Sequence, residues 1–506
     1  MKLEQAHINK IRIAFEKMQS REDFLHLMNE AKPMVYGEKA VPFELKQLTL
    51  YTNPKSGTKR YTSFKIKKKS GSERSIHAPV NGLKSLQKTL SFILQCVFEP
   101  HHAAMGFIRG KSIVDNANIH TGSRYIYNID MKDFFPSIDQ ARVWKCLQLK
   151  PFNLKDDAKT SESENSKLQT GIRKFITDHG ESIFYQIKNN TLTLVHDKNG
   201  NYKKYEERLT NHIVKPNTQH LSFDFEYSKK LLEYRELVNN IIFEDSKRYI
   251  LSPESLKQLE RLVYSRQTIA NIIASLCCTE MEVERKNDAD EWITVKRNVL
   301  PQGAPTSPVI TNIICQRLDY ILSGVAKRFG LSYSRYADDI TFSSMHNVYQ
   351  QDSEFLKELH RIITEQGFHI KETKTRLQKD GYRKEVTGLL VNEKVNVQHR
   401  YIKQLRMWLY YWENYGYERA YAYFLQQYMT DKWNIVNGKP DMVNVIAGKL
   451  DYLKMVKGAE NQQYLKLKGR FDVLSSNVNS ISNILEIWER EGIEKAIESY
   501  YCTKSK

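Results

Sequence analysis

The sequence predicts an α+β protein, because short segments with strand-like alternation lie between longer segments with helical periodicity. Residues 60–80 and 330–344 have the alternation and the turn residues of β-hairpins. Residues 83–98 and 398–506 instead place apolar side chains at helical spacing. With 506 residues, 41% of them hydrophobic, the chain is long enough for about two to four domains.

Local signals predict the N-terminal elements in order. Residues 1–50 are expected to be helical, with Ser20 as an N-cap and Asp23 in the first turn of the second helix. The hairpin that follows carries Lys and Arg on its arms and turns at residues 70–72. After the next helix, "RYIYNIDM" at 124–131 has the composition of a strand.

Residues 151–265 differ in character from the rest of the chain. The stretch "DDAKTSESENSK" is polar and indicates a loop. We expect a helix-like run at 170–190, a small hairpin with an Asn-Gly turn at 199–200, and further helices to residue 265. We interpret this region as an insertion or accessory subdomain.

The elements after the insertion alternate between helical and extended. They are expected to be a helix at 267–279, a Pro/Gly loop with a helix at 299–322, the hairpin at 330–344, a helix at 352–366, a short hairpin near 385–397, and helices over 398–506.

The net charge of +18 favours a polyanionic partner, most often nucleic acid. The 29 tyrosines and 21 phenylalanines are interleaved with Lys and Arg, which suits base stacking as well as core packing. The alternative is a generic basic surface.

Cysteine usage and the N-terminus favour a cytoplasmic protein with reduced, buried thiols. The N-terminal residues are charged and have no apolar signal core. No apolar run approaches the roughly 18 residues of a membrane span, so no membrane partner is expected. None of the six cysteines has zinc-type CxxC spacing: Cys96, Cys146, Cys277, Cys278, Cys315 and Cys502.

Two adjacent acids, Asp338 and Asp339, lie inside an otherwise apolar hairpin. Because side chains alternate along a strand, adjacent acids converge on one point only at a tight turn. Asp130 ends an upstream strand, and Asp133 follows it after a short turn. An isolated acid pair is most simply a solvated turn, but the apolar flanks "YA" and "ITF" argue against that interpretation here.

Carboxylates that converge from two strands repel one another unless a cation lies between them. Mg²⁺ is held by one or two carboxylates and takes its other ligands from water and phosphates. A pair of such ions activates an attacking 3′-hydroxyl and stabilises the leaving pyrophosphate. The acids therefore indicate a two-metal site, with Mn²⁺ as a substitute ion.

Several motifs in order resemble those of reverse transcriptases, including a hairpin like that of the fingers. In "NANIH" (116–120) and "VTG" (386–388) the chain is similar to bacterial retron-type and other defence-associated members, although the large insertion departs from the compact retron enzymes. The other matching segments are "FKIKKKSGSERSIHAP" (64–79), "DMKDFF" (130–135), "LPQGAPTSPVITN" (300–312), "YADD" (336–339), "GFHIKETKTRL" (367–377) and "VTGLLVN" (386–392).

The resemblance implies a right-hand polymerase fold, with fingers, a palm of antiparallel sheet plus helices, and a helical thumb. The implied boundaries are an N-terminal helical region at 1–50, fingers at 51–123, palm at 124–150 and 266–397 around the insertion at 151–265, thumb at 398–470, and a helical tail at 471–506.

The resemblance also assigns roles to residues of the palm and fingers. Asp130, Asp338 and Asp339 would be the metal ligands, helped by the main-chain carbonyl of Met131. Phe135 would be the steric gate that favours dNTPs, and Lys374 a general acid near the pyrophosphate. The remaining nucleotide-binding residues would be Lys65, Arg74, Asp133, Phe134, Gln302, Gly303 and Tyr336.

The partners implied are dNTPs, a template–primer and a structured non-coding RNA. Asn116 and His120 share a helix face and would be structural or would contact RNA. An effector protein and self-association through the tail are further candidates. The other RNA-contact candidates are Lys67, Lys68, Arg400, Lys403 and Arg406.

The activity expected is RNA-directed DNA synthesis in bacterial antiphage defence. Three alternatives remain open at the level of sequence. These are untemplated or protein-primed DNA synthesis on the same palm, a mobile-element enzyme such as a group II intron reverse transcriptase, and a nucleic-acid-binding module without catalysis. The intact set of three acids argues against the last.

Overall fold

The computed structural model describes residues 5–52, 58–67, 73–155, 266–287, 289–431 and 440–495, together with five strands inside 172–248. The chain divides into two compact units. The first consists of Met1–Thr62, His77–Glu99 and Ile138–Ser307, and the second of Ser63–Ile76, Pro100–Ser137 and Pro308–Lys506. We describe each unit by itself.

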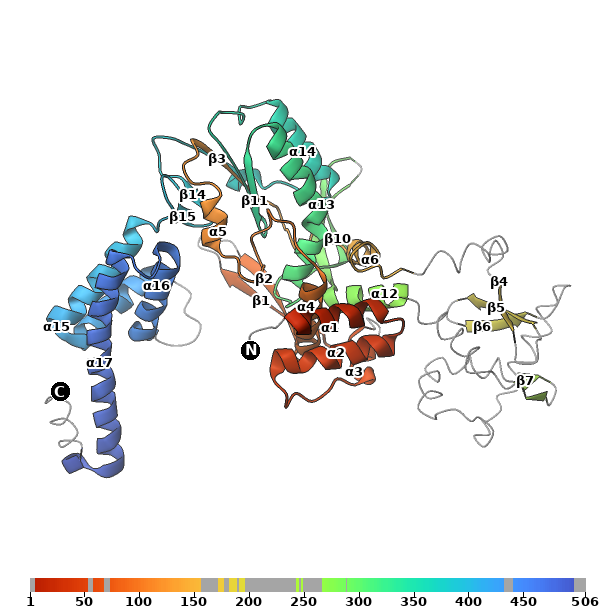
Figure 1. Ribbon diagram of the computed structural model, residues 1–506, viewed down its shortest axis with the longest axis horizontal. Helices are drawn as coiled ribbons and strands as arrows, with labels where there is room; N and C mark the ends of the chain where they lie inside the picture. Colours follow the sequence, from red (N-terminus) through yellow and green to blue (C-terminus); the bar gives the residue numbers. More distant parts are fainter. Residues whose placement is uncertain are drawn as a thin grey trace. The chain divides into compact units, whose positions relative to one another are not determined.

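The first unit is mainly helical, as predicted for its N-terminal part (Figure 1). Ser20 and Asp23 form a capping box at the start of α2 (Arg21–Tyr36), which confirms the predicted cap. The helix α4 (Asn81–Val97) packs against α1 and α2 through a face of fully buried leucines and isoleucines. The other helices of this unit are α1 (Gln5–Lys17), α3 (Leu45–Thr52), α6 (Gln140–Leu147) and α12 (Arg266–Cys277).

A long hairpin in the first unit was not predicted. Strands β9 (Thr279–Lys286) and β10 (Trp292–Val299) pair antiparallel along eight residues. In β9 exposed charged residues alternate with less exposed ones, a period-two strand pattern that the sequence interpretation overlooked, whereas most of β10 is exposed and lacks this pattern.

The predicted helix at 170–190 is wrong, because two strands cover most of that range. Strands β4 (Ile172–Ile176), β5 (Ser182–Lys188) and β6 (Thr191–Val195) form an antiparallel sheet in that order. Ile183, Tyr185 and Ile187 of "SIFYQIK" recur with period two, a strand pattern that the sequence interpretation overlooked.

The predicted hairpin with a turn at 199–200 has its first arm in β6, which pairs with the preceding β5. The turn itself and the helices expected up to residue 265 lie outside the described residues. The short strands β7 (Phe243–Glu244) and β8 (Lys247–Arg248) form a further pair.

The second unit is built on a four-stranded antiparallel sheet, as predicted for a palm. The strand order is β11 (Ser332–Tyr336), β12 (Asp339–Ser344), β3 (Tyr125–Asp130) and β13 (Arg376–Lys379). The hairpin of β1 (Tyr61–Lys67) and β2 (Glu73–Pro79) also forms as predicted, with its turn at 70–72 outside the described residues.

Helices cover both faces of this sheet. On one face, Tyr333 and Phe342 lie opposite each other and contact α13 (Ser307–Arg328) and α14 (Glu354–Glu365) respectively. On the other face, Ser334 bonds to the short helix α5 (Ile113–Asn118). Because both faces are covered, polar groups on the inner strands must find partners inside the protein.

The C-terminal part of the second unit is helical, as predicted for a thumb. Helices α15 (His399–Asp431), α16 (Met442–Lys457) and α17 (Gln462–Glu491) contact one another (Figure 1). The chain bends inside α15 at Gly416, whose φ of 77° is left-handed. Because α17 runs without a break through residues 470 and 471, the predicted boundary between thumb and tail lies inside this helix.

The short hairpin of β14 (Glu385–Val386) and β15 (Leu389–Leu390) precedes these helices.

Of the helices in the described ranges, none is both long and apolar enough to cross a bilayer. The cysteines of those ranges are thiols, and all but the half-buried Cys146 are buried.

Candidate active site

The sheet register brings the predicted acids together at one edge of the second unit. Asp130, the last residue of β3, lies directly opposite Asp339, the first residue of β12. Asp338 belongs to the tight turn between β11 and β12, and its carbonyl accepts a hydrogen bond of 3.2 Å from Met131 N. Residues more than 200 positions apart thus meet as the spacing of the motifs predicts.

The electrostatics of these acids are those of a crowded, partly desolvated cluster. Burial, the Asp338 charge and the Asp130 charge raise the pKa of Asp339 to about 6. Burial and the Asp130 charge also raise the pKa of Asp338, while Lys374 and Arg74 oppose the shift. The cluster therefore needs additional positive charge at neutral pH.

Asp130 shows the need for a cation most clearly. Asp130 is only 6% exposed. Its Oδ2 lies in an ion pair with Lys374 Nζ. A carboxylate that is removed from water in this way needs a cation close to it, so its oxygens suit a metal ligand.

The acids fit a divalent cation by the chemistry of their oxygens rather than by a preformed geometry. Within the described ranges, no three acidic, histidine or cysteine side chains form a ready-made ligand set. Three hard carboxylates at one sheet edge are nonetheless the oxygen ligands that Mg²⁺ prefers. Asp130, Asp338 and Asp339 would hold such an ion.

Adding Mg²⁺ at constant ionic strength is expected to raise the melting temperature more at pH 7.5 than at pH 5.5. The raised pKa of Asp339 means that its contribution to stability is full below the ordinary carboxyl pKa and is lost as the pH rises through about 6. Above that pH the ion finds a charged ligand and relieves repulsion. Differential scanning fluorimetry measures the shift.

Two variants control this experiment. Asp339→Asn should reduce the Mg²⁺ shift at pH 7.5, whereas Asp352→Asn should leave it unchanged, because Asp352 is an exposed residue outside the cluster. Equal shifts in the parent protein and Asp339→Asn would contradict the assignment.

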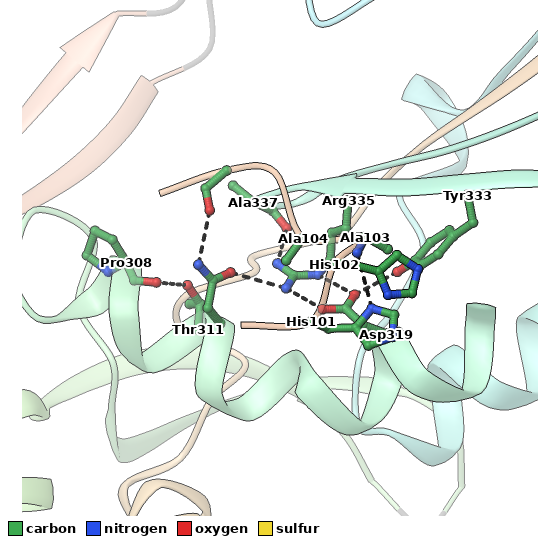
Figure 2. A network of polar contacts seen from close by, with 12 residues as sticks. His101, His102, Ala103, Ala104, Pro308, Thr311, Asp319, Tyr333, Arg335 and Ala337 are labelled. Carbon is green, nitrogen blue, oxygen red and sulfur yellow. Dashed lines mark hydrogen bonds and ion pairs between the residues drawn. The ribbon is translucent and has the colours of Figure 1, made fainter. Parts of the chain in front are cut away.

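A buried ion pair lies beneath the turn that carries the acids (Figure 2). Arg335 on β11 donates to both carboxylate oxygens of Asp319 on α13, at 2.8 and 2.7 Å, and both side chains are almost fully buried. A third nitrogen of Arg335 donates to the carbonyl of Ala337 at 3.1 Å. The guanidinium thus fixes the main chain one residue before Asp338.

Ala337 itself has a left-handed φ of 59°. A non-glycine residue holds this conformation only when its surroundings fix it, and such residues cluster at functional sites. The backbone of Gly106 lies so close that a Cβ there would be 2.6 Å from Ala337 N. Asn312 links Arg335 to Gly106, because its side chain accepts a hydrogen bond from Arg335 at 3.1 Å and donates one to Gly106 O at 3.0 Å.

The sequence interpretation missed this supporting group of Arg335, Asp319, Asn312 and Gly106. One signal was available, since Arg335 occupies a position of β11 that points to the same face as Tyr333. A charged side chain on a buried strand face implies a buried partner.

The two phenylalanines after Asp130 differ in burial. Phe134 is 3% exposed and packs against Phe368, with ring centroids 5.7 Å apart. Phe135 is half-buried and lies next to Phe134 and Phe107. Asp133, with a φ of 44°, is exposed. The gate role of Phe135 and the nucleotide contacts of Asp133 and Phe134 remain predictions.

The cations of the β1–β2 hairpin have different environments. Arg74 is exposed, and its charge lowers the pKa of Asp338, which agrees with a place near the acids. Lys65 forms an ion pair of 2.8 Å with Glu73, and both side chains are largely exposed. For Lys67 only the backbone is described, and Lys68 lies outside the described residues.

The predicted loop residues Gln302 and Gly303 belong to the first unit. Gln302 O accepts a hydrogen bond from His77 N at 2.8 Å. Gly303 has a φ of 116°, which favours glycine. Their contact with a nucleotide, like that of the half-buried Tyr336 in the second unit, stays a prediction.

Asn116 and His120 are buried, so the structure favours the structural one of their two predicted roles. His120 bonds to Ser343 Oγ at 2.8 Å and to Ser334 Oγ at 2.7 Å. Ser334 donates its hydroxyl proton to Asn116 Oδ1 at 2.7 Å, so it must accept from His120 Nε2–H. Burial lowers the pKa of His120 to about 3, so its ring is neutral at pH 7.

We expect stability to fall below pH 6.5 because of His120. A group with a lowered folded-state pKa contributes stability that is present above its ordinary pKa and lost as the pH falls toward the folded value, here from 6.5 to about 3. The slope is about 1.4 kcal/mol per pH unit. Urea unfolding at pH 7.5 and 5.5, followed by fluorescence, measures it.

His120→Gln should lose less stability than the parent between those two pH values, because glutamine does not titrate. His102→Gln serves as a matched control, since His102 is exposed and should leave the slope unchanged. The same loss in the parent and in His120→Gln would contradict this account.

Three predicted RNA-contact cations lie on exposed positions along the first turns of α15: Arg400, Lys403 and Arg406. Apolar residues between them, such as Leu405 and Trp408, are buried in the core of the helical part. The three cations therefore form an exposed basic row on one helix, and their contact with RNA stays a prediction.

The fold and the site together indicate the class of protein. An antiparallel four-stranded sheet with one acid at the end of its central strand and two on the adjoining hairpin is the arrangement predicted for a polymerase palm. Comparisons with known proteins point to the same class. Residues 200–399 match the family described as reverse transcriptase (RNA-dependent DNA polymerase). The match begins after β3, so it does not include Asp130.

Three similar proteins are retron reverse transcriptases. The retron Mx162 reverse transcriptase of Myxococcus xanthus is 27% identical over 66% of this chain and 47% of its own length. The retron Mx65 reverse transcriptase of the same species is 24% identical over 70% and 57%. The retron Ec86 reverse transcriptase of Escherichia coli is 31% identical over 39% and 58%.

The chain thus spans about half the length of the Myxococcus relatives it matches. A telomerase structure from Candida albicans aligns over 94% of this chain and 70% of its own, with a TM-score of 0.34 and 12% sequence identity. The sequence matches confirm the predicted resemblance to retron-type reverse transcriptases and, with the observed palm, the predicted fold class.

Proposed function

We propose that this protein is an RNA-directed DNA polymerase whose active site is the acid cluster of the palm. The observation that carries the proposal is the strand register that sets Asp130 opposite Asp339, next to Asp338. The basic charge of the chain and the likeness to retron reverse transcriptases support a nucleic-acid substrate.

In the proposed reaction, each residue of the site has a distinct role. Two Mg²⁺ ions, or Mn²⁺ in their place, would supply activation of a 3′-hydroxyl and charge neutralisation at the pyrophosphate. Asp130, Asp338, Asp339 and the Met131 carbonyl would be the ligands of these ions. Phe135 would pack against the position of a ribose 2′-hydroxyl, and Arg74 and Lys65 would clamp the triphosphate of the incoming dNTP.

Lys374 has a double role in this proposal. Its ammonium pairs with Asp130. Lys374 is also about half exposed, so its ammonium would be able to donate a proton to the leaving pyrophosphate.

The template proposed is a structured non-coding RNA and the biological role is antiphage defence, as the resemblance of "NANIH" and "VTG" to retron-type enzymes implies. The predicted effector, self-association and cytoplasmic location belong to the same proposal. Untemplated or protein-primed synthesis is the second candidate, because the same palm serves either reaction.

Sequencing of the DNA that co-purifies with the protein distinguishes these candidates. A product complementary to one RNA from the neighbourhood of the gene supports the proposal. A homopolymer, or DNA attached to a protein side chain, would favour the second candidate. Protein with the substitutions Asp338→Ala and Asp339→Ala should carry no such DNA.

A further inference from the structure

Phe107 is an exposed aromatic residue in a strained backbone conformation. Its φ is 62°, in the left-handed region, and its side chain is 41% exposed. Bulky residues rarely adopt this conformation, and an asparagine or glycine would do so at lower cost. Strain of this kind persists where the surroundings fix it, commonly at a functional site.

The segment that leads to Phe107 is fixed to the strand before the acids. Met105 N donates to Arg335 O at 2.8 Å, and Arg335 N donates to Ala103 O at 2.9 Å. One residue further on, Gly106 touches the backbone of Ala337 and accepts a hydrogen bond from Asn312. Phe107 therefore projects from a segment whose position is set by the catalytic hairpin.

The ring of Phe107 lies beside the predicted gate. Its centroid is 6.3 Å from that of Phe135, with the two planes at 47°. Phe135 also has the buried Phe134 next to it, at 5.4 Å and edge to face. Phe135 is thus in contact with one ring from the protein interior and one from the exposed segment.

We propose that Phe107 is a specificity-determining residue, which braces Phe135 so that the nucleotide site excludes a ribose 2′-hydroxyl. The inference rests on the proposed polymerase function and adds a residue to its sugar discrimination. A gate ring excludes a hydroxyl only if it cannot rotate away. Phe107 limits that rotation from outside the core, and the hydrogen bonds of residues 103–106 hold its segment in place.

The test compares single-nucleotide incorporation of dNTP and rNTP on a primed RNA template by the purified full chain. Phe107→Asn removes the ring but suits the left-handed backbone, so the variant should fold. We expect its dNTP/rNTP ratio of kcat/KM to fall about threefold to tenfold, which is what an aromatic pair is worth. Phe107→Tyr keeps the ring and should keep the ratio, as should Tyr382→Asn, which removes a ring that is 76% exposed.

Further outcomes separate bracing from other roles. In a Phe135→Ala background, Phe107→Asn should change the ratio no further, because the gate is already absent. A parental ratio in Phe107→Asn, an equal loss for both nucleotides, or a further change in the Phe135→Ala background would overturn the inference. If the parent protein incorporated no dNTP, the proposed function itself would fail, and this result is distinct from the others.

Discussion

Replacing Asp130 by asparagine is expected to abolish DNA synthesis while the protein stays folded. Asparagine has the same size but lacks the charge that holds a divalent cation. An ion at this site supplies several kcal/mol of transition-state stabilisation, so its loss should slow incorporation by about a thousandfold or more. Primer extension with purified protein measures the rate.

The matched control for this prediction is Asp352→Asn. Asp352 is an exposed aspartate of the same unit with a φ of 63°, a conformation that asparagine also tolerates. It should retain parental activity. DNA synthesis at the parental rate by Asp130→Asn would show that the chemistry occurs elsewhere.

Replacing Arg335 by methionine is expected to destabilise the second unit by about 3–5 kcal/mol, because it leaves the buried Asp319 carboxylate without its partner. The substitution also removes the donor to Ala337 O and to Asn312 Oδ1. Urea unfolding followed by fluorescence measures the loss of stability. Arg361→Met should cost at most about 0.5 kcal/mol, because its pair with Glu365 is exposed.

A double variant separates stability from positioning. Asp319→Leu combined with Arg335→Met replaces the pair by apolar groups and should recover most of the lost stability. It should still polymerise slowly, since nothing then holds the carbonyl of Ala337 before Asp338. Full activity in the refolded double variant would contradict the role of Arg335 in holding the turn.

The acids of the site could be predicted from the sequence because their signal is local. Asp338 and Asp339 interrupt an apolar hairpin, and Asp130 ends an apolar strand. Burying a carboxylate without a partner is costly, so acids at such positions indicate a functional site. Strand pairing then supplies the register that joins them. The helical N-terminus and the cap at Ser20 follow from equally local chemistry.

The support of the site could not be predicted in the same way. Arg335, Asp319 and Gly106 meet through tertiary contacts that no spacing along the chain encodes. The strain at Ala337 and Phe107 is likewise set by neighbours distant in sequence. The wrong prediction of a helix at 170–190 had a different cause. The segment was interpreted as helical although the seven residues of β5 contain a strand-like alternation.

The most direct test of the central claim is primer extension on a defined RNA template with purified protein and Mg²⁺, with the product read by sequencing. We expect DNA complementary to the template from the parent protein, and none from Asp338→Asn. A product that does not follow the template, or complementary DNA from both proteins, would contradict RNA-directed synthesis at this acid cluster.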